Sequence, residues 1–238
     1  MPTPGKLGKL AAVRPHGLGT LATYALGKLP APPASVDYGL HVTNWQMLGN
    51  DQYGDCTMAG AAHLLRAWDS EVAEDDRVPT AQEVVDEYFT LTDGQDSGLN
   101  EHDVLSTWHS IGLWGDRIAG YAPVEPADLT ALHQAIAFYG GAYLGVALPE
   151  SAQEQFAHGE EWTVVPDSQI AGGHCIIAVG YDAHSVRVVT WGAEVSVSYP
   201  WLASYLDEAW CVLSHQFLEA GHGPTLDLAS LQEDLDAV

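Results

Sequence analysis

The stretch that most constrains this chain is residues 48–68, LGNDQYGDCTMAGAAHLLRAW, because it predicts where a central helix begins. Asp55 is a good helix N-cap, and Cys56 follows it in the first turn. Small apolar residues then recur at near-helical spacing, which suits a helix buried on most sides. Free N–H groups and the helix dipole favour a thiolate at Cys56. Cys56 is therefore a candidate nucleophile, although most lone cysteines are small buried hydrophobic residues.

A second stretch, residues 170–182, reads IAGGHCIIAVGYD and predicts a buried strand that begins near a histidine. Gly172 and Gly173 directly precede His174, and two residues without side chains leave room for a substrate backbone. His174 is therefore a candidate general base for Cys56.

Taken together, these motifs resemble the papain-like cysteine peptidase superfamily over about residues 45–215. The resemblance is carried by GDC opening a helix, by GGH leading into an apolar strand that ends in GYD, and by VVTWG after it. The separation of Cys56 and His174 is of the order of the roughly 130–150 residues found in papain-type enzymes. The resemblance implies an α+β fold. Its helical N-terminal half has Cys56 at the start of a central helix, and its antiparallel β-sheet C-terminal half carries His174.

The resemblance also implies a thiol hydrolase that cleaves a peptide or other amide bond, with Cys56 as nucleophile and His174 as base, then acid. The oxyanion would be held by the backbone N–H of Cys56 and by one side-chain amide. Gln52 has the residue type that the family uses there, whereas Asn50, six residues before Cys56, has the usual offset. We prefer Gln52 and keep Asn50 as the alternative.

The third catalytic position is where this sequence departs from the family pattern. The family usually has Asn or Asp on the strand after the histidine strand, just before a tryptophan, and here that stretch reads VTW. Thr190 takes the position before Trp191 and can hydrogen-bond the imidazole only weakly, which puts strong catalysis in doubt. Asp182 or Glu194 are alternative partners for the ring. Trp191 is expected to cover the ring of His174.

The charge distribution separates a basic arm from an acidic body. The chain has eight Lys and Arg against 32 Asp and Glu, a formal net charge of −24. Four of the basic residues lie in the first 28 residues, which contain no acid: Lys6, Lys9, Arg14 and Lys28. Such an arm invites contact with another acidic surface or with a second copy of the chain, and a solvated tail is the alternative. The acidic body is not expected to bind nucleic acid, because phosphate contacts need Lys and Arg.

Three segments are predicted along the chain: an extended basic Pro/Gly-rich arm over 1–35, a papain-like α+β domain over 36–220, and an acidic C-terminal tail over 221–238. The arm either lies over the domain or reaches a partner. The sequence patterns predict helices over 78–92, from about 100, over 126–139 and around 228–235. They predict strands over 118–124, 142–148, 162–165, 174–180, 186–191, 196–199 and 209–214.

Composition and cysteine spacing indicate the expected location of the protein and its need for metals or cofactors. No run approaches the roughly 18 apolar residues of a membrane span. Prolines and glycines interrupt the N-terminal segment and no apolar core follows, so no signal peptide is expected. The three cysteines form no Cys-x-x-Cys pair, so neither a metal nor a cofactor is expected. These features favour a cytoplasmic or particle-associated protein.

Several functions compete. The leading hypothesis is a papain-like thiol hydrolase with a peptide or protein substrate. The alternative is a catalytically weak or inactive papain-like fold that serves as a structural or binding module, for example a phage or particle component whose arm docks on a neighbour. A bacterial cell-wall amide hydrolase ranks lower, because the Cys and His of such enzymes are closer together in sequence than Cys56 and His174 are. Acyl transfer by the same Cys and His stays open.

Overall fold

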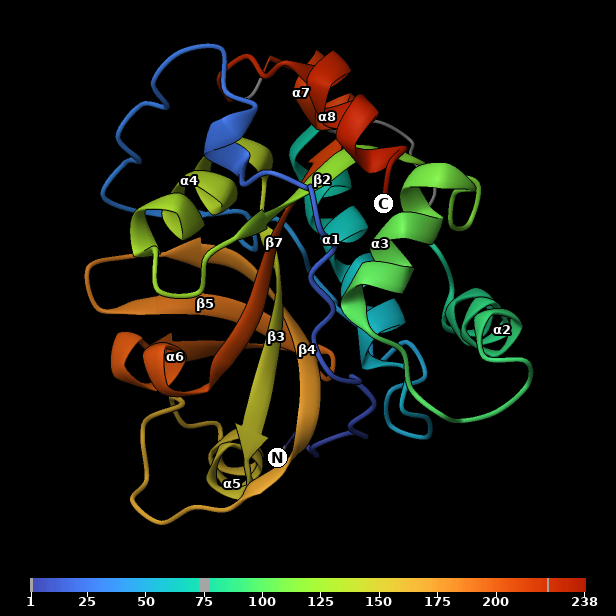
Figure 1. The fold of residues 1–238 in the computed structure, drawn as a ribbon. Coiled ribbons are helices and arrows are strands. Elements are labelled where there is room, and N and C mark those ends of the chain that lie inside the picture. Colours follow the sequence, from blue (N-terminus) through green and yellow to red (C-terminus); the bar gives the residue numbers. More distant parts are fainter. Residues whose placement is uncertain (1, 73–77, 222) are drawn as a thin grey trace.

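A layer of helices packs against a twisted antiparallel sheet in the computed structural model, which describes residues 2–72, 78–221 and 223–238 (Figure 1). The undescribed residues include the first residue of the predicted arm and one residue of the predicted tail. The predicted α+β class is confirmed, with the helices α1, α2 and α3 gathered on one side of the sheet.

The helices are short, apart from the one that begins at Cys56. Their bounds are α1 Cys56–Val72, α2 Ala81–Leu91, α3 Glu101–Ser110, α4 Leu129–Tyr139, α5 Glu150–His158, α6 Tyr199–Tyr205, α7 His215–Glu219 and α8 Leu228–Leu235. A single turn of 3-10 helix covers Leu21–Thr23.

The sheet has strand order β2-β7-β3-β4-β5-β6, with β1 paired to β4 off this path. Each pairing is antiparallel. The strand bounds are β1 Val36–Asp37, β2 Ile118–Val124, β3 Ala142–Pro149, β4 Ile170–Tyr181, β5 Ser185–Thr190, β6 Ala193–Ser198 and β7 Leu206–Ser214. The long strand β4 carries His174, which lies opposite Val146 of β3.

The helix α1 is buried along most of its length and packs against β4, as the small-residue pattern predicts. Gly60 allows this approach, because a Cβ at that position would lie 2.9 Å from Sγ of Cys175 on β4. Helix and sheet therefore meet at the N-terminal end of α1, where Cys56 lies. In the part of the chain that the structure describes, no helix combines the length and the apolar character needed to cross a membrane.

Local sequence signals placed two helix starts correctly. Thr80 and Glu83 form the predicted capping box at α2, with each side chain bonded to the other residue's backbone N–H. Asn100 caps α3 by accepting a hydrogen bond of 2.8 Å from the N–H of Asp103. The predicted strand over 118–124 matches β2.

One predicted helix is confirmed with a later start, and one predicted strand is not found in the described residues. The helix predicted over 126–139 begins at Leu129, because the side chain of Asp128 caps it by accepting from the N–H of Ala131. The strand predicted over 162–165 is absent from the described structure, where Trp162 makes only an isolated bridge with Val197. A short apolar run without a partner strand does not form a ladder, and the apolar side chain of Trp162 is buried in the core instead.

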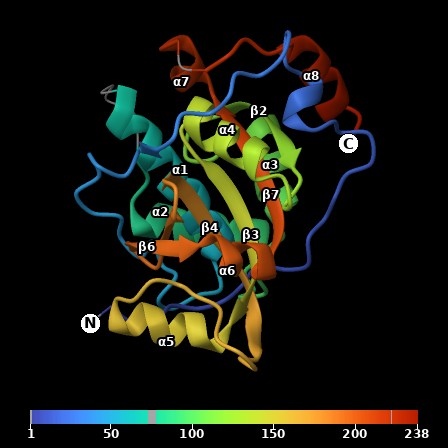
Figure 2. The same ribbon diagram turned by 90° about the vertical axis from the view of Figure 1, so that its left-hand side faces the viewer.

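The N-terminal arm lies over the body of the molecule. Figures 1 and 2 show it starting near α5 and running along the boundary between helices and sheet toward α8. There it meets the C-terminal segment. Ala25 pairs with Leu226, and the hydroxyl of Tyr24 donates a 2.7 Å hydrogen bond to Asp234 of α8. The predicted helix around 228–235 is confirmed.

Candidate active site

Cys56 is the first residue of α1, and its thiol is buried. The backbone N–H groups of Cys175 on β4 and of Gly8 in the arm lower the pKa of this thiol. Burial has the larger effect and raises the pKa of Cys56 to about 12. The pKa lowering expected from the helix start is therefore not seen, because the arm and β4 exclude water from the sulfur.

His174 is fully buried on β4, and its ring is held by the last residue of β5 and by the residue after it. Its Nε2 atom lies 2.6 Å from Oγ1 of Thr190. Trp191 covers the ring as expected, with ring centroids 4.7 Å apart and an interplanar angle of 30°. The Nδ1 atom has no hydrogen-bond partner among the described residues. Burial lowers the pKa of His174 to about 3, so the ring is neutral at pH 7.

The structure brings Cys56 close to the start of the histidine strand, because α1 packs against β4. A Cβ on Gly60, about one turn after Cys56, would lie 2.9 Å from Sγ of Cys175, the neighbour of His174. No hydrogen bond between the Cys56 thiol and the His174 ring is found in the described structure. With the pKa of the thiol raised and that of the imidazole lowered, the proton stays on sulfur. In this closed arrangement the two groups are neutral rather than a thiolate and an imidazolium.

The two candidates for the oxyanion site differ in their surroundings. The side-chain amide of Asn50 is buried and donates to two backbone carbonyls, that of Lys6 in the arm at 3.1 Å and that of Tyr53 at 3.0 Å. Gln52 is exposed and lies at the rim of the groove that holds the arm. Asn50 thus already contacts a peptide carbonyl, whereas Gln52 is free to turn toward one.

Asp96 supports the loop that leads into α1, a role that the sequence analysis missed. Its Oδ1 atom accepts hydrogen bonds of 2.8 Å from the N–H of Gly54 and from the hydroxyl of Tyr88. The same hydroxyl accepts a hydrogen bond of 2.9 Å from the N–H of Gly98. The acidic loop over 93–98 therefore joins α2 to the residues just before Cys56. The turn-rich sequence DGQDSG was the only signal available for it.

Residues 6–10 of the arm lie in a groove that passes the Cys56 end of α1 and the His174 end of β4. The arm is bound there by its backbone. The N–H of Lys9 donates to the carbonyl of Gly173 at 3.3 Å. The N–H of Leu99 donates to the carbonyl of Gly8 at 3.0 Å, and the N–H of Leu10 donates to the carbonyl of Leu99 at 3.0 Å. The arm is thus held as a bound peptide is held.

Glycines on both sides allow the arm to come this close. A Cβ on Gly8 would lie 1.7 Å from the carbonyl oxygen of Gly54. A Cβ on Gly173 would lie 2.3 Å from the carbonyl oxygen of Lys9. The room expected beside the glycine pair before His174 therefore exists, and the arm fills it.

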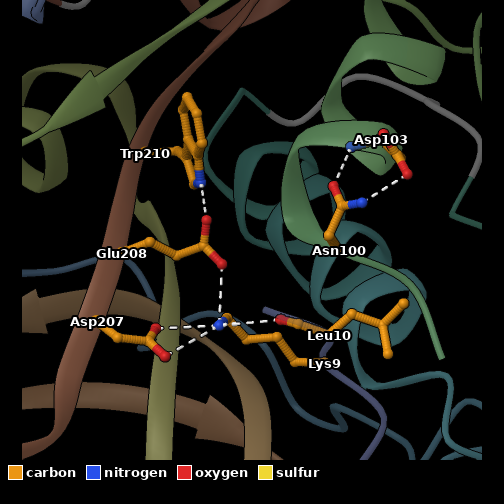
Figure 3. Close-up of polar contacts among 7 residues, drawn as sticks. All are labelled: Lys9, Leu10, Asn100, Asp103, Asp207, Glu208 and Trp210. Carbon is orange, nitrogen blue, oxygen red and sulfur yellow. Dashed lines mark hydrogen bonds and ion pairs between the residues drawn. The ribbon is translucent and has the colours of Figure 1, made fainter. Parts of the chain in front are cut away.

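The side chain of Lys9 leaves the groove and enters an acidic pocket (Figure 3). Its Nζ atom lies 3.0 Å from Oδ1 of Asp207 and 3.0 Å from Oε1 of Glu208. It also donates to the carbonyl of Leu10 at 3.4 Å. The other carboxylate oxygen of Glu208 accepts a 3.2 Å hydrogen bond from the indole N–H of Trp210. The basic arm and the acidic body therefore meet within one molecule.

No protein-family model matches the sequence, and no curated protein matches it. Solved structures do show similarity. Xylellain, a cysteine protease from Xylella fastidiosa, matches with a TM-score of 0.68 and 13% identity over 90% of this chain and 98% of its own. A cysteine protease from Carica candamarcensis, CMS1MS2 in complex with E-64, matches with a TM-score of 0.54 and 15% identity over 76% and 99%.

A third match comes from a structural study of the mite allergens Blo t 1 and Der p 1, with a TM-score of 0.54 and 14% identity over 85% of this chain and 75% of that one. At such low identities the similarity concerns the fold. It agrees with a mixed α+β architecture of helices packed against an antiparallel sheet. The chain therefore has the papain-like cysteine protease fold.

Proposed function

We propose that this protein is a papain-like thiol hydrolase of peptide or other amide bonds, with Cys56 as nucleophile and His174 as general base. One observation carries the proposal. The backbone of residues 6–10 lies in the groove beside both side chains, with Gly8 packed against Gly54 and with the N–H of Lys9 bonded to the carbonyl of Gly173. The groove therefore accepts an extended peptide next to a cysteine at a helix start.

The reaction follows from these positions once the arm has left the groove. The sulfur of Cys56 attacks the carbonyl carbon, and His174 takes the thiol proton and passes it to the leaving amine. Water then attacks the thioester while His174 takes a proton from it and returns the proton to the departing sulfur. The oxyanion is held by the backbone N–H of Cys56 and the side-chain amide of Gln52, with Asn50 as the alternative. Thr190 positions the imidazole.

When the arm leaves the groove, the charged forms of Cys56 and His174 that the reaction needs become more favourable. Burial is the largest cause of the raised pKa of Cys56 and of the lowered pKa of His174. Water that replaces the arm stabilises the charged form of each group, so the two pKa values move toward each other. A thiolate is then favoured by the free N–H groups at the start of α1.

The test compares the full-length protein with Gly8→Ala, whose added Cβ would lie 1.7 Å from the carbonyl oxygen of Gly54. We expect this clash to expel the arm from the groove. Iodoacetamide alkylation is followed against pH, and the modified cysteine is mapped by mass spectrometry. We expect slow reaction of Cys56 in the native chain and fast reaction at pH 6–7 in Gly8→Ala. The reaction should slow again when His174→Ala is added. Ala11→Val, at an exposed arm position, is the control.

The proposal fails if Cys56 in Gly8→Ala reacts no faster than an ordinary thiol with a pKa of about 8.5. That result would favour the second candidate, an inactive papain-like fold that serves as a binding module. The observation in favour of this candidate is the hydroxyl of Thr190 where the family uses Asn or Asp. In that case the groove binds peptides without cleaving them, and the arm of one copy can dock in another. Light scattering of the native chain over a range of concentrations measures such self-association.

A further inference from the structure

We propose that Glu101, Asp207 and Glu208 form a recognition pocket for a lysine side chain, and that Lys9 of the arm is its resident ligand. We call these three residues the lysine pocket. The inference deepens the proposed function by naming the side chain that a peptide in the groove presents. It rests on that function only for the statement that the peptide is a substrate, because the pocket binds without any reaction at Cys56.

The first argument is the completeness with which the ammonium is buried and paired. The side chain of Lys9 is only 1% exposed, and that of Glu208 only 2%. An ammonium group is strongly disfavoured in such a place unless opposite charges surround it. Burial alone would lower the pKa of Lys9, but Glu208, Glu101 and Asp207 together raise it above its ordinary value. The cation is therefore held in its charged form by the pocket.

The second argument is the number of carboxyl groups gathered around this single cation. Glu101 is fully buried, and neither oxygen of its carboxyl group bonds a nitrogen or oxygen atom in the described part of the chain. Burial and then the charge of Glu208 raise the pKa of Glu101 well above its ordinary value, and Lys9 opposes this shift. Without the ammonium, the carboxylate of Glu208 would stay buried without its cation, so the pocket is incomplete when empty.

The third argument is the width of the passage into the pocket. A Cβ on Gly145 of β3 would lie 2.0 Å from Cε of Lys9 and 2.6 Å from Cγ of Glu208. Even one added carbon atom at this position would thus occupy the space of the lysine chain. The passage fits an unbranched methylene chain that ends in a compact cation, which is the shape of a lysine side chain.

The backbone contacts extend this reasoning from the arm to other peptides. Gly8, Lys9 and Leu10 are held by carbonyl and N–H groups of Gly173 and Leu99, which any extended peptide could bond. In this segment, the side chain of Lys9 is the part that the carboxyl groups of the pocket recognise by its positive charge. The ligand class is therefore a peptide in which a glycine is followed by a lysine.

The first experiment empties the pocket and refills it with a small molecule. In Lys9→Ala, n-propylammonium supplies the missing three methylene carbons and the nitrogen. We expect it to raise the melting temperature of Lys9→Ala in a saturable way, whereas 1-propanol should not. Lys6→Ala removes an exposed lysine from the same arm and should show no such response. An equal effect of amine and alcohol, or no effect of the amine, would overturn the proposal.

The second experiment tests a peptide in trans with the Gly8→Ala protein, in which the arm is expelled. The ligand is a synthetic peptide of residues 4–11, and binding is measured by calorimetry in a Cys56→Ser background so that no turnover is involved. Norleucine in place of Lys9 should weaken binding about ten-fold or more, which corresponds to about 1.4 kcal/mol. Norleucine in place of Lys6 should change it little. Equal binding of all three peptides would refute the lysine pocket and leave the hydrolase proposal standing.

Discussion

Nε2 of His174 lies 2.6 Å from Oγ1 of Thr190, so a hydroxyl holds this side of the buried ring. A hydroxyl both donates and accepts, whereas a carboxylate only accepts. The contact therefore places the imidazole without fixing which nitrogen carries the proton. Trp191 supplies the remaining restraint by stacking on the ring.

Removing this hydroxyl should destabilise the protein. Thr190→Val keeps the shape of the side chain but leaves both nitrogens of the buried His174 ring without a partner. We expect the free energy of unfolding to fall by about 1–3 kcal/mol, the usual penalty for an orphaned buried polar group. Urea denaturation measures it. Thr190→Ser retains the hydroxyl and is the matched control, and equal stability of the valine and serine variants would contradict the prediction.

The ring of His174 should stay neutral well into the acid range. Its pKa is lowered to about 3 by burial, while an unfolded chain titrates near 6.5. Between these values the unfolded state binds a proton that the folded state does not, so this group lowers stability as pH falls from 6.5 toward 3. Side-chain NMR of His174 should show no titration between pH 7.5 and 4.5. A midpoint near 6.5 would show that the ring is open to water.

Asp55, the residue before Cys56, should give the opposite pH dependence. Burial raises the pKa of its carboxyl group to about 8, so the folded state holds a proton that the unfolded state releases above pH 3.8. Its contribution to stability therefore declines as pH rises from about 4 to 8, by up to about 1.4 kcal/mol per pH unit. Asp55→Asn removes this titration. The stability of the variant relative to the native chain should rise over that range in urea titrations, and parallel curves would disprove the assignment.

Asp96 should matter both for stability and for the position of Cys56. Asp96→Ala leaves the N–H of Gly54 and the hydroxyl of Tyr88 without their shared acceptor. We expect a loss of about 1–3 kcal/mol in the free energy of unfolding. Faster alkylation of Cys56 should accompany it, because the loop before α1 loosens. Asp96→Asn keeps one carbonyl oxygen as acceptor and should retain most of both properties.

The sequence predicted the parts of the site that depend on local patterns. The helix at Cys56, the strand at His174 and the ring cover by Trp191 follow from short motifs, and the structure agrees with each. The protonation of these residues was not predictable in the same way. The pKa of Cys56 depends on burial in the folded chain and on the backbone N–H of Gly8, which lies far away in the sequence.

The lysine pocket also depends on contacts between residues that are distant in sequence, which local patterns do not predict. Lys9 was recognised as part of a basic arm, but its partners Asp207 and Glu208 lie almost two hundred residues further along the chain. An acidic body offers many carboxylates, and composition does not indicate which of them a given lysine will meet. The place of Glu101 in this pocket was not predictable either. At the first position of α3 it resembles an ordinary acidic residue at a helix N-terminus.

The hydrogen bond from the hydroxyl of Tyr24 to Asp234 affects any peptide that competes with the arm for the groove. This contact fixes the arm at residue 24, so residues 6–10 remain tethered beside the groove even when they have left it. A tethered segment returns as if it were present at an effective concentration in the millimolar range. A free peptide with the same contacts must exceed that concentration to displace the arm. A partner that first breaks this hydrogen bond at α8 would lower the effective concentration of the arm without touching the groove.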